Sequence, residues 1–270
     1  MYSEHPPLLC DGQVSAAGDL LISAREGGIV LGELPAACRP MSHSDSQRII
    51  DYVYERRAIP ASGWKIYFPY KPRVAPVVTP IYDVFLSGKT IERNNTPRLI
   101  EAELVFQALT DLRARRAPYR FEEAAAAFRV MPAFEVLRTR YLAEPLRTQA
   151  FWPDPAAERS YAYEMFADNT VNDCFIVGEA CESWSHVDFT TMPVSVCQDG
   201  YELGSSVGGH PLQDPFLAVV AGLNFMRHRG GIRKGQIVAT TSVTDFFEVS
   251  ANSGVIGDFG SLGRVSASFR

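Results

Sequence analysis

The stretch PRLIEAELVF, residues 97–106, places two glutamates two positions apart in an otherwise apolar run. Such a run predicts a β-strand, in which successive side chains alternate between two faces, so Glu101 and Glu103 point to the same side. Their carboxylates would lie roughly 6–7 Å apart and would repel each other in a desolvated site. A hard divalent cation such as Mg²⁺ or Mn²⁺ removes that repulsion by taking an oxygen from each. The motif alone favours a plainer alternative, the solvated outer face of an edge strand.

Two further charged residues in apolar runs shift the interpretation toward a site. The run MPAFEVL, residues 131–137, carries the single acid Glu135, which could supply a third oxygen ligand from a neighbouring strand. Upstream, GWKIYF at residues 63–68 places Lys65 among apolar and aromatic residues, where an ammonium needs an anionic partner unless its head reaches water. The order lysine, Glu-x-Glu, glutamate therefore suggests a metal site with a cation beside it.

The bulk composition is that of an ordinary globular protein. Of 270 residues, 46% are hydrophobic and 21% are charged, which is enough for one large core and a smaller appended unit. A net charge of −5 without a basic block argues against nucleic acid or an anionic membrane as partner and leaves a small molecule as the expected partner.

The N-terminus lacks a signal-peptide pattern and the longest apolar stretch, residues 216–226, is too short to cross a bilayer, so we expect a soluble, cytoplasmic protein. The five cysteines are irregularly spaced without a CxxC pair, which argues against a zinc site or a disulfide framework.

Local patterns divide the chain into two regions. We expect a small N-terminal helical region at residues 1–62 and a β-rich, metal-binding catalytic domain at residues 63–270. In the first region, a helix is predicted over residues 44–57, with Ser44 or Asp45 as its N-cap.

The second region combines many strands with two helices. The helices are predicted over residues 121–128 and 214–231, the latter with Asp214 as its cap. The pair Asp199-Gly200 between alternating residues predicts a β-hairpin. The expected strands are short apolar and β-branched runs at residues 63–68, 77–86, 98–107, 130–137, 174–178, 193–204, 236–243 and 264–269.

From about residue 63 to the C-terminus, the chain resembles the 2-keto-4-pentenoate hydratase and 4-oxalocrotonate decarboxylase family of the fumarylacetoacetate hydrolase superfamily. The stretches that carry the resemblance occur in the family's order: GWKI (63–66), PIYDVF (80–85), PRLIEAELVF (97–106), PAFEV (132–136), ADN (167–169), GGHPL (208–212), IRKGQIV (232–238) and GDFGSLGRVSASF (257–269). The resemblance implies a β-rich α+β fold, namely a distorted, rolled β-sheet or barrel with a small N-terminal helical part. It also implies a homo-oligomer.

The resemblance implies a role for eight residues. The family's metal ligands for Mg²⁺ or Mn²⁺ correspond to Glu101, Glu103 and Glu135, and its catalytic lysine corresponds to Lys65. The implied substrate-binding residues are Asp168 and Asn169 of the ADN stretch, together with the hydroxyl-bearing Ser242 and Thr244.

The reaction implied is the addition of water to a short 2-hydroxydienoate, such as 2-hydroxypenta-2,4-dienoate, through a metal-stabilised dienolate in the breakdown of aromatic compounds. Decarboxylation of a 2-oxo-enedioate similar to 4-oxalocrotonate is the alternative. Hydrolysis of an acylpyruvate is a weaker one, because His186 and His210 show no spacing typical of a His/Glu pair. A non-catalytic, ligand-binding family member is a further alternative, because Arg138 replaces an acid of the family and because the loop that follows Lys65 is shorter than usual in the family.

Overall fold

The structure consists of two units. The computed structural model describes residues 8–67, 76–92, 98–141 and 161–270. Unit 1 comprises Met1–Ile59 and Thr139–Asn172, and unit 2 comprises Pro60–Arg138 and Asp173–Arg270. The first boundary lies close to the expected one at residue 62, but residues 139–172 also belong to the first unit. Across the described ranges, no helix is both long and apolar enough to cross a membrane.

Unit 1 is helical. Its elements are α1 (Asp11–Gly27), η1 (Ala36–Cys38), α2 (His43–Arg57), α5 (Tyr161–Ala167) and η3 (Asn169–Val171). The helix predicted over residues 44–57 is confirmed as α2. Its predicted N-cap is wrong, because the hydroxyl of Ser42 accepts the N–H of Asp45.

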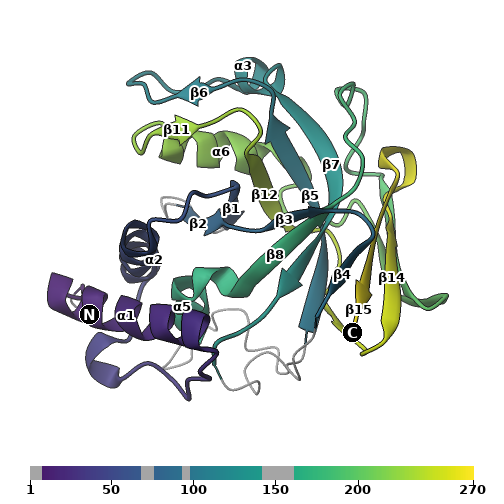
Figure 1. Cartoon of the computed structure of the whole chain (residues 1–270). Helices are drawn as coiled ribbons and strands as arrows, with labels where there is room; N and C mark the ends of the chain where they lie inside the picture. The colour runs from purple at the N-terminus through teal and green to yellow at the C-terminus, as the bar shows by residue number, and fades with distance from the viewer. Residues whose placement is uncertain (1–7, 68–75, 93–97, 142–160) are drawn as a thin grey trace, which may run out of the picture. The chain divides into compact units, whose positions relative to one another are not determined.

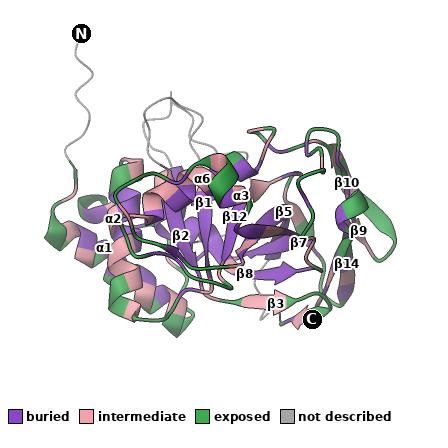
Figure 2. Ribbon diagram, turned by 90° about the horizontal axis from the view of Figure 1, so that it is seen from above, coloured by how far each residue is buried: buried purple, intermediate pink, exposed green. Residues whose placement is uncertain are grey.

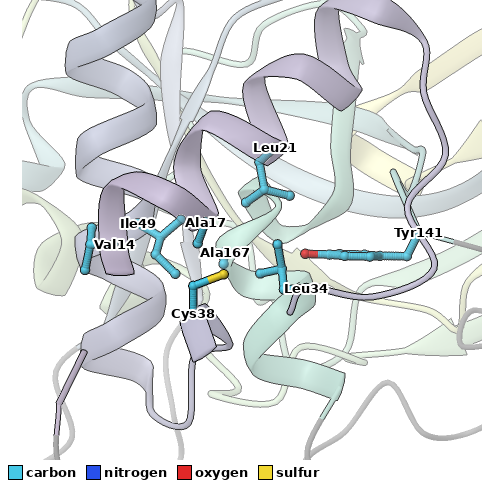
Figure 3. Packing of buried hydrophobic residues seen from close by; sticks show 8 residues of the cluster. All are labelled: Val14, Ala17, Leu21, Leu34, Cys38, Ile49, Tyr141 and Ala167. Atoms are coloured by element: carbon cyan, nitrogen blue, oxygen red, sulfur yellow. The ribbon is translucent and has the colours of Figure 1, made fainter. Parts of the chain in front are cut away.

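One apolar core holds the helices of unit 1 together. Its buried residues are Val14, Ala17, Leu21, Leu34, Cys38, Ile49, Tyr141 and Ala167 (Figure 3). Helix α1 was not predicted. Three of its five buried residues are alanine or glycine, so its apolar periodicity is weak in the sequence.

Unit 2 is built from strands (Figure 1). The strands are β1 (Gly63–Tyr67), β2 (Val77–Ile81), β3 (Val84–Leu86), β4 (Lys89–Ile91), β5 (Arg98–Ala108), β6 (Leu112–Arg113), β7 (Phe128–Leu137), β8 (Asn172–Val177), β9 (Pro193–Gln198), β10 (Tyr201–Val207), β11 (Gly231–Ile232), β12 (Ile237–Ser242), β13 (Phe247–Val249), β14 (Ser253–Asp258) and β15 (Arg264–Phe269). The helices are α3 (Phe121–Ala125), α6 (Phe216–Met226) and η4 (Gly260–Leu262). The predicted hairpin is confirmed between β9 and β10, where Asp199 and Gly200 both have positive φ.

The strands form a large curled sheet, a smaller one and the two-stranded pair β11-β6. The large sheet has the order β2-β1-β12-β5-β7-β8-β3, with β13 also paired to β5, and it curls into a half-barrel. The smaller sheet has the order β10-β9-β14-β15-β4. The predicted β-rich α+β fold with a rolled sheet is therefore confirmed.

The strands at the centre of the large sheet are buried on both faces (Figure 2). On one face, helix α6 covers the sheet, and its Phe216 packs against Phe106 of β5 with ring centroids 5.1 Å apart. Gly222 of α6 allows the helix to approach β1 closely, because a Cβ atom at this position would lie 2.4 Å from the side chain of Ile66. The opposite face carries the Glu-x-Glu motif.

Candidate metal centre

The Glu-x-Glu strand lies inside the sheet, not at its edge. Strand β5 pairs with β12 on one side and with β7 on the other. Glu101 is 8% exposed and Glu103 is fully buried, so the solvated edge strand that the motif alone favoured is wrong. Two carboxylates on a central strand need a compensating charge.

Strand pairing brings the third acid and the lysine to the same face. Glu101 is the direct cross-strand partner of Glu135 on β7. Lys65 of β1 is in register with Ala239 of β12, and Ala239 is in register with Val105, two residues from Glu103. Alternation places all of these side chains on one face of the sheet. The small side chain of Ala239 leaves room for Lys65 to reach across β12.

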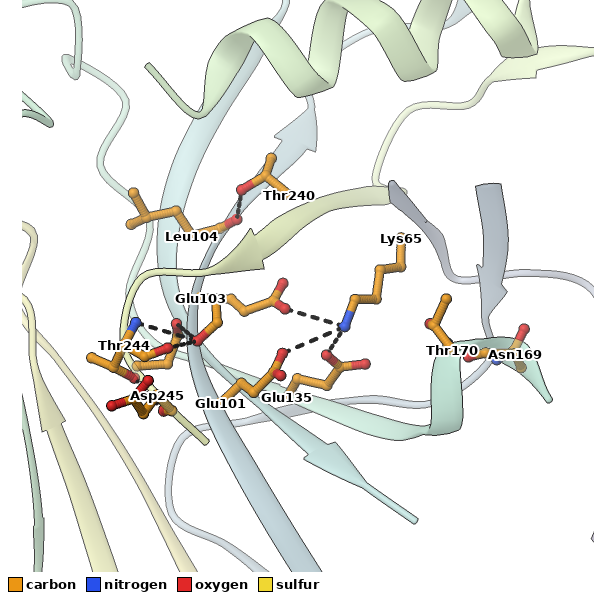
Figure 4. Close-up of polar contacts among 12 residues, drawn as sticks. Lys65, Glu101, Glu103, Leu104, Glu135, Asn169, Thr170, Thr240, Thr244 and Asp245 are labelled. Carbon is orange, nitrogen blue, oxygen red and sulfur yellow. Dashed lines mark hydrogen bonds and ion pairs between the residues drawn. The ribbon is translucent and has the colours of Figure 1, made fainter. Parts of the chain in front are cut away.

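The lysine contacts all three acids (Figure 4). Its Nζ atom lies 3.6 Å from Oε2 of Glu101 and 3.3 Å from Oε1 of Glu103, and it donates a hydrogen bond to Glu135. One oxygen of each carboxylate lies within 4.8 Å of the others, which is close enough for a single ion to reach all three. The metal ligands expected from the sequence therefore meet in space together with Lys65.

The surroundings of the acids are apolar. A buried hydrophobic cluster on unit 2 includes Val105, Met131, Ala133 and Ala239, which share the face of the acids by strand alternation. Desolvation penalises the ionised form of a carboxylate, and this effect dominates at the two fully buried glutamates.

Burial raises the pKa of Glu103 to about 7, although the ammonium of Lys65 opposes the change. Burial likewise raises the pKa of Glu135 well above its ordinary value, again against the effect of Lys65. For Lys65 itself, burial lowers the pKa, but the three carboxylates outweigh burial and raise the pKa. The lysine therefore remains an ammonium ion, while two of the glutamates hold protons more readily than usual.

The site fits a hard divalent cation on two grounds. Fully ionised, three carboxylates and one ammonium carry a formal charge of −2, which a divalent ion neutralises. In addition, the carboxylate of the buried Glu103 has an ion pair with Lys65 at 3.3 Å, but neither of its oxygens accepts a well-formed hydrogen bond from the described residues. A buried carboxylate with so few donors is costly, and a cation that accepts oxygen ligands removes that cost.

The predicted substrate-binding residues fall in both units. In unit 2, Ser242 is the cross-strand partner of Glu103, and its hydroxyl lies 2.6 Å from the carbonyl oxygen of Thr244. The hydroxyl of Thr244 donates to the carbonyl of Asp245. Both hydroxyls are thus engaged by nearby backbone.

In unit 1, Asp168 and Asn169 are buried at 2% and 7% exposure. The carboxylate of Asp168 accepts the backbone N–H of Arg140 and lies 3.6 Å from its guanidinium. The next three residues, Asn169 to Val171, all have positive φ values between 51° and 59°. Such conformations are costly for residues other than glycine, so the surrounding contacts must hold this turn.

Two features near the expected site residues, one in each unit, were not predicted. One is the pairing of Arg140 with Asp168, for which the sequence offers no local signal because 28 positions separate the two residues. The other is a φ of 121° at Thr241 on β12, next to Glu103 on the neighbouring strand. Threonine rarely adopts this conformation, so the sequence argues against it.

Comparison with known proteins supports the same fold. No family model and no curated protein matches the sequence. The structure is similar to that of 4-oxalocrotonate decarboxylase from Pseudomonas putida G7 complexed with magnesium and adipate, with a TM-score of 0.76 and 22% identity over 97% of this chain and 99% of that one. The complex of that enzyme with calcium and acetate gives a TM-score of 0.75 and 21% identity over the same shares of the two chains. Fumarylpyruvate hydrolase from Pseudomonas aeruginosa, in complex with Mn²⁺ and pyruvate, is more distant, with a TM-score of 0.50 and 14% identity over 73% of this chain and 79% of that one. The chain thus has the fold of the fumarylacetoacetate hydrolase superfamily, as the sequence resemblance implied.

Proposed function

We propose that the protein is a divalent-metal-dependent lyase acting on a short, unsaturated 2-oxo or 2-hydroxy acid. The single observation that carries the proposal is the convergence of three buried carboxylates and one ammonium on one face of the sheet. Solved structures with this fold contain magnesium, calcium or Mn²⁺ together with small organic acids. Glu101, Glu103 and Glu135 would hold Mg²⁺ or Mn²⁺ here.

When bound, the ion supplies positive charge that stabilises the negative charge developing on the oxygens of a 2-oxo acid. Lys65 stays protonated, so it can hold an anionic oxygen of the substrate or donate a proton to a carbon atom. It cannot act as a general base while the carboxylates keep its proton in place. The apolar residues beside the acids keep bulk water away and strengthen these electrostatic effects.

Two reactions fit this arrangement, because both pass through a dienolate of the substrate. End-to-end similarity to 4-oxalocrotonate decarboxylase favours decarboxylation of a 2-oxo-enedioate. Addition of water to a 2-hydroxydienoate is the second candidate, the reaction expected from the resemblance of the sequence to the family. Asp168 and Asn169 would contact the substrate in either case. Assembly into a homo-oligomer and a role in the breakdown of aromatic compounds belong to the same proposal.

A comparison of two substrates tests the proposal. With Mg²⁺ present, 2-oxo-hex-3-enedioate should lose its ultraviolet absorbance with release of CO₂ if the enzyme is a decarboxylase. Loss of the absorbance of 2-hydroxypenta-2,4-dienoate without CO₂ would identify a hydratase. The variant Glu103→Gln keeps the shape of the side chain and should lower kcat by about 10²–10³-fold, as expected when charge stabilisation is lost. Full activity in EDTA, or in Glu103→Gln, would refute the metal-dependent mechanism.

A further inference from the structure

Strand β12 contains a β-bulge beside the acid cluster. Ala239 pairs with Val105 and Ser242 pairs with Glu103, so β12 advances three residues while β5 advances two. The extra residue lies at Thr240 or Thr241, and Thr241 has a φ of 121°. A β-bulge changes the direction of the chain that follows it. A strained backbone conformation persists only where the surrounding contacts impose it.

The chain after the bulge is bound to the backbone of the Glu-x-Glu motif. The N–H of Val243 donates to the carbonyl oxygen of Ala102 at 2.8 Å, and the hydroxyl of Ser242 lies 3.3 Å from the same oxygen. Ala102 is the residue between the two glutamates. The Ser242 hydroxyl donates its single proton to the nearer Thr244 carbonyl at 2.6 Å and accepts the N–H of Thr244, so these two bonds fix the conformation of residues 242–244.

The same segment is held from its other side. The carbonyl oxygen of Val243 accepts a hydrogen bond of 2.6 Å from the hydroxyl of Ser206 on β10. Gly209 packs so closely that a Cβ atom at its position would lie 2.0 Å from this oxygen. The backbone of Val243 can therefore shift little, and its hydrogen bond to the Ala102 carbonyl is held in a fixed position.

We propose that the bulge of β12 positions the paired carboxylates. Val243 acts as a positioning residue through its hydrogen bond to the Ala102 carbonyl, and the Ser242 hydroxyl acts as one by fixing the turn that presents the Val243 N–H. The inference rests on the proposed function, since it assumes that the acid cluster holds a divalent ion. The orientation of the Ala102 peptide sets the backbone of both neighbouring glutamates. A fixed Ala102 thus maintains the spacing at which Glu101, Glu103 and Glu135 reach one ion.

Binding of Mn²⁺, measured by electron paramagnetic resonance on the full chain, tests this role without an activity assay. Ser242→Ala should raise the dissociation constant for Mn²⁺ by about tenfold, as found when groups that orient metal ligands are removed. Ser242→Thr retains the hydroxyl and should restore the affinity to within about twofold of the wild type. Ser253→Ala is the matched control, because the hydroxyl of this buried serine donates to the Ser250 carbonyl within unit 2 and belongs to neither β12 nor β5. It should leave the affinity unchanged.

The strain at Thr241 is tested by thermal unfolding of the metal-free protein. Thr241→Gly should leave the melting temperature unchanged or raise it by about 2–4 °C, since glycine accepts positive φ. Thr240→Gly is the control at an ordinary φ. Thr240 is buried and its hydroxyl donates to the Leu104 carbonyl, so this variant should lower the melting temperature by roughly 4–10 °C.

The outcomes separate the two proposals. If the wild type fails to bind Mn²⁺, both the metal-dependent function and this inference are overturned. If the wild type binds Mn²⁺ but Ser242→Ala matches Ser253→Ala, only the positioning role is overturned. Equal losses of melting temperature in Thr241→Gly and Thr240→Gly would show that the bulge stores no strain and would remove that part of the inference.

Discussion

Replacing Lys65 with methionine isolates the electrostatic part of the acid cluster. The ammonium lies within 4 Å of all three carboxylates, and the lysine side chain is 8% exposed. Methionine keeps an unbranched, apolar stem of similar length and removes only the charge and its hydrogen bond. The variant therefore leaves three acids facing one another in an apolar environment without their cation.

The expected loss of stability is large. Removing one partner from a buried ion pair costs about 3–5 kcal/mol, because the remaining charge is left without compensation. In a chain of this size, each kcal/mol shifts the melting temperature by roughly 2–4 °C. Lys65→Met should therefore lower the melting temperature of the metal-free protein by roughly 6–20 °C at about pH 8. The loss should shrink toward about pH 5.5, where protonation of the carboxylates relieves their repulsion.

A divalent ion should reverse the effect. A bound ligand stabilises the folded state by about 2.7 kcal/mol when present at 100 times its dissociation constant. Without the ammonium competing for the carboxylates, the increase in melting temperature on adding Mg²⁺ should be larger in Lys65→Met than in the wild type. Differential scanning fluorimetry in EDTA and in Mg²⁺ measures both shifts.

The matched control is Lys234→Met, which changes an exposed lysine in the turn before β12. Its melting temperature should stay within about 1 °C of the wild type, since exposed charges contribute little. If the melting temperature of Lys65→Met in EDTA matches that of this control, the buried contacts of Lys65 with the acids do not stabilise the fold. The electrostatic account of the site is then refuted.

Three further outcomes are expected. The stabilisation by Mg²⁺ should grow between about pH 5.5 and pH 8, because Glu103, with its pKa raised to about 7, must lose its proton to bind the ion. In the absence of metal, the contribution of Glu103 to the stability of the folded protein is present below its unfolded pKa and is lost as the pH rises through 7. His210 acts in the opposite direction: burial lowers its pKa to about 4, so its contribution to stability is present above about pH 6.5 and is lost as the pH falls through 4, by roughly 3 kcal/mol in total. Urea unfolding at a series of pH values should show that His210→Gln removes this acid-dependent part, and an unchanged slope would contradict the assignment. Phe216→Ala should cost about 3–5 kcal/mol, because this fully buried ring packs against several other aromatic rings, while Mn²⁺ affinity stays within about twofold, since α6 covers the face of the sheet opposite the acids.

The histidine contacts also bear on the hydrolytic alternative. The ring of His210 accepts the N–H of Leu212 at Nδ1 and lies 3.4 Å from the Thr240 carbonyl at Nε2. This arrangement requires the neutral tautomer with the proton on Nε2. His210 is thus engaged with backbone on both sides, which fits a structural role better than activation of water.

Local periodicity was enough to predict much of unit 2 from the sequence. Alternation along residues 97–106 placed Glu101 and Glu103 on one face, and the Asp199-Gly200 pair marked the hairpin between β9 and β10. These features depend on neighbours in the chain, so the sequence encodes them directly. The single charges of Glu135 and Lys65 in their apolar runs completed the candidate site, the resemblance to a known family added the fold and the roles of these residues, and the structure brings the four charged residues together.

Other features had no local signal. The face of α1 that packs in unit 1 is made mostly of small residues, and the cap of α2 lies two or three residues earlier than the sequence suggested. The sequence could not decide between an edge and a central position for β5. That distinction depends on which other strands pair with it, and β7 and β12 lie at quite different distances along the chain.

By itself, therefore, the sequence determined the strand, the side on which its two glutamates point and the kind of ion that paired carboxylates prefer. Only the tertiary structure decided that these acids are buried, that Lys65 reaches across β12 to meet them and that Thr241 takes a strained conformation beside them. The physical reason is that side-chain direction follows from the local backbone, whereas strand order, desolvation and strain come from contacts between residues far apart in the chain.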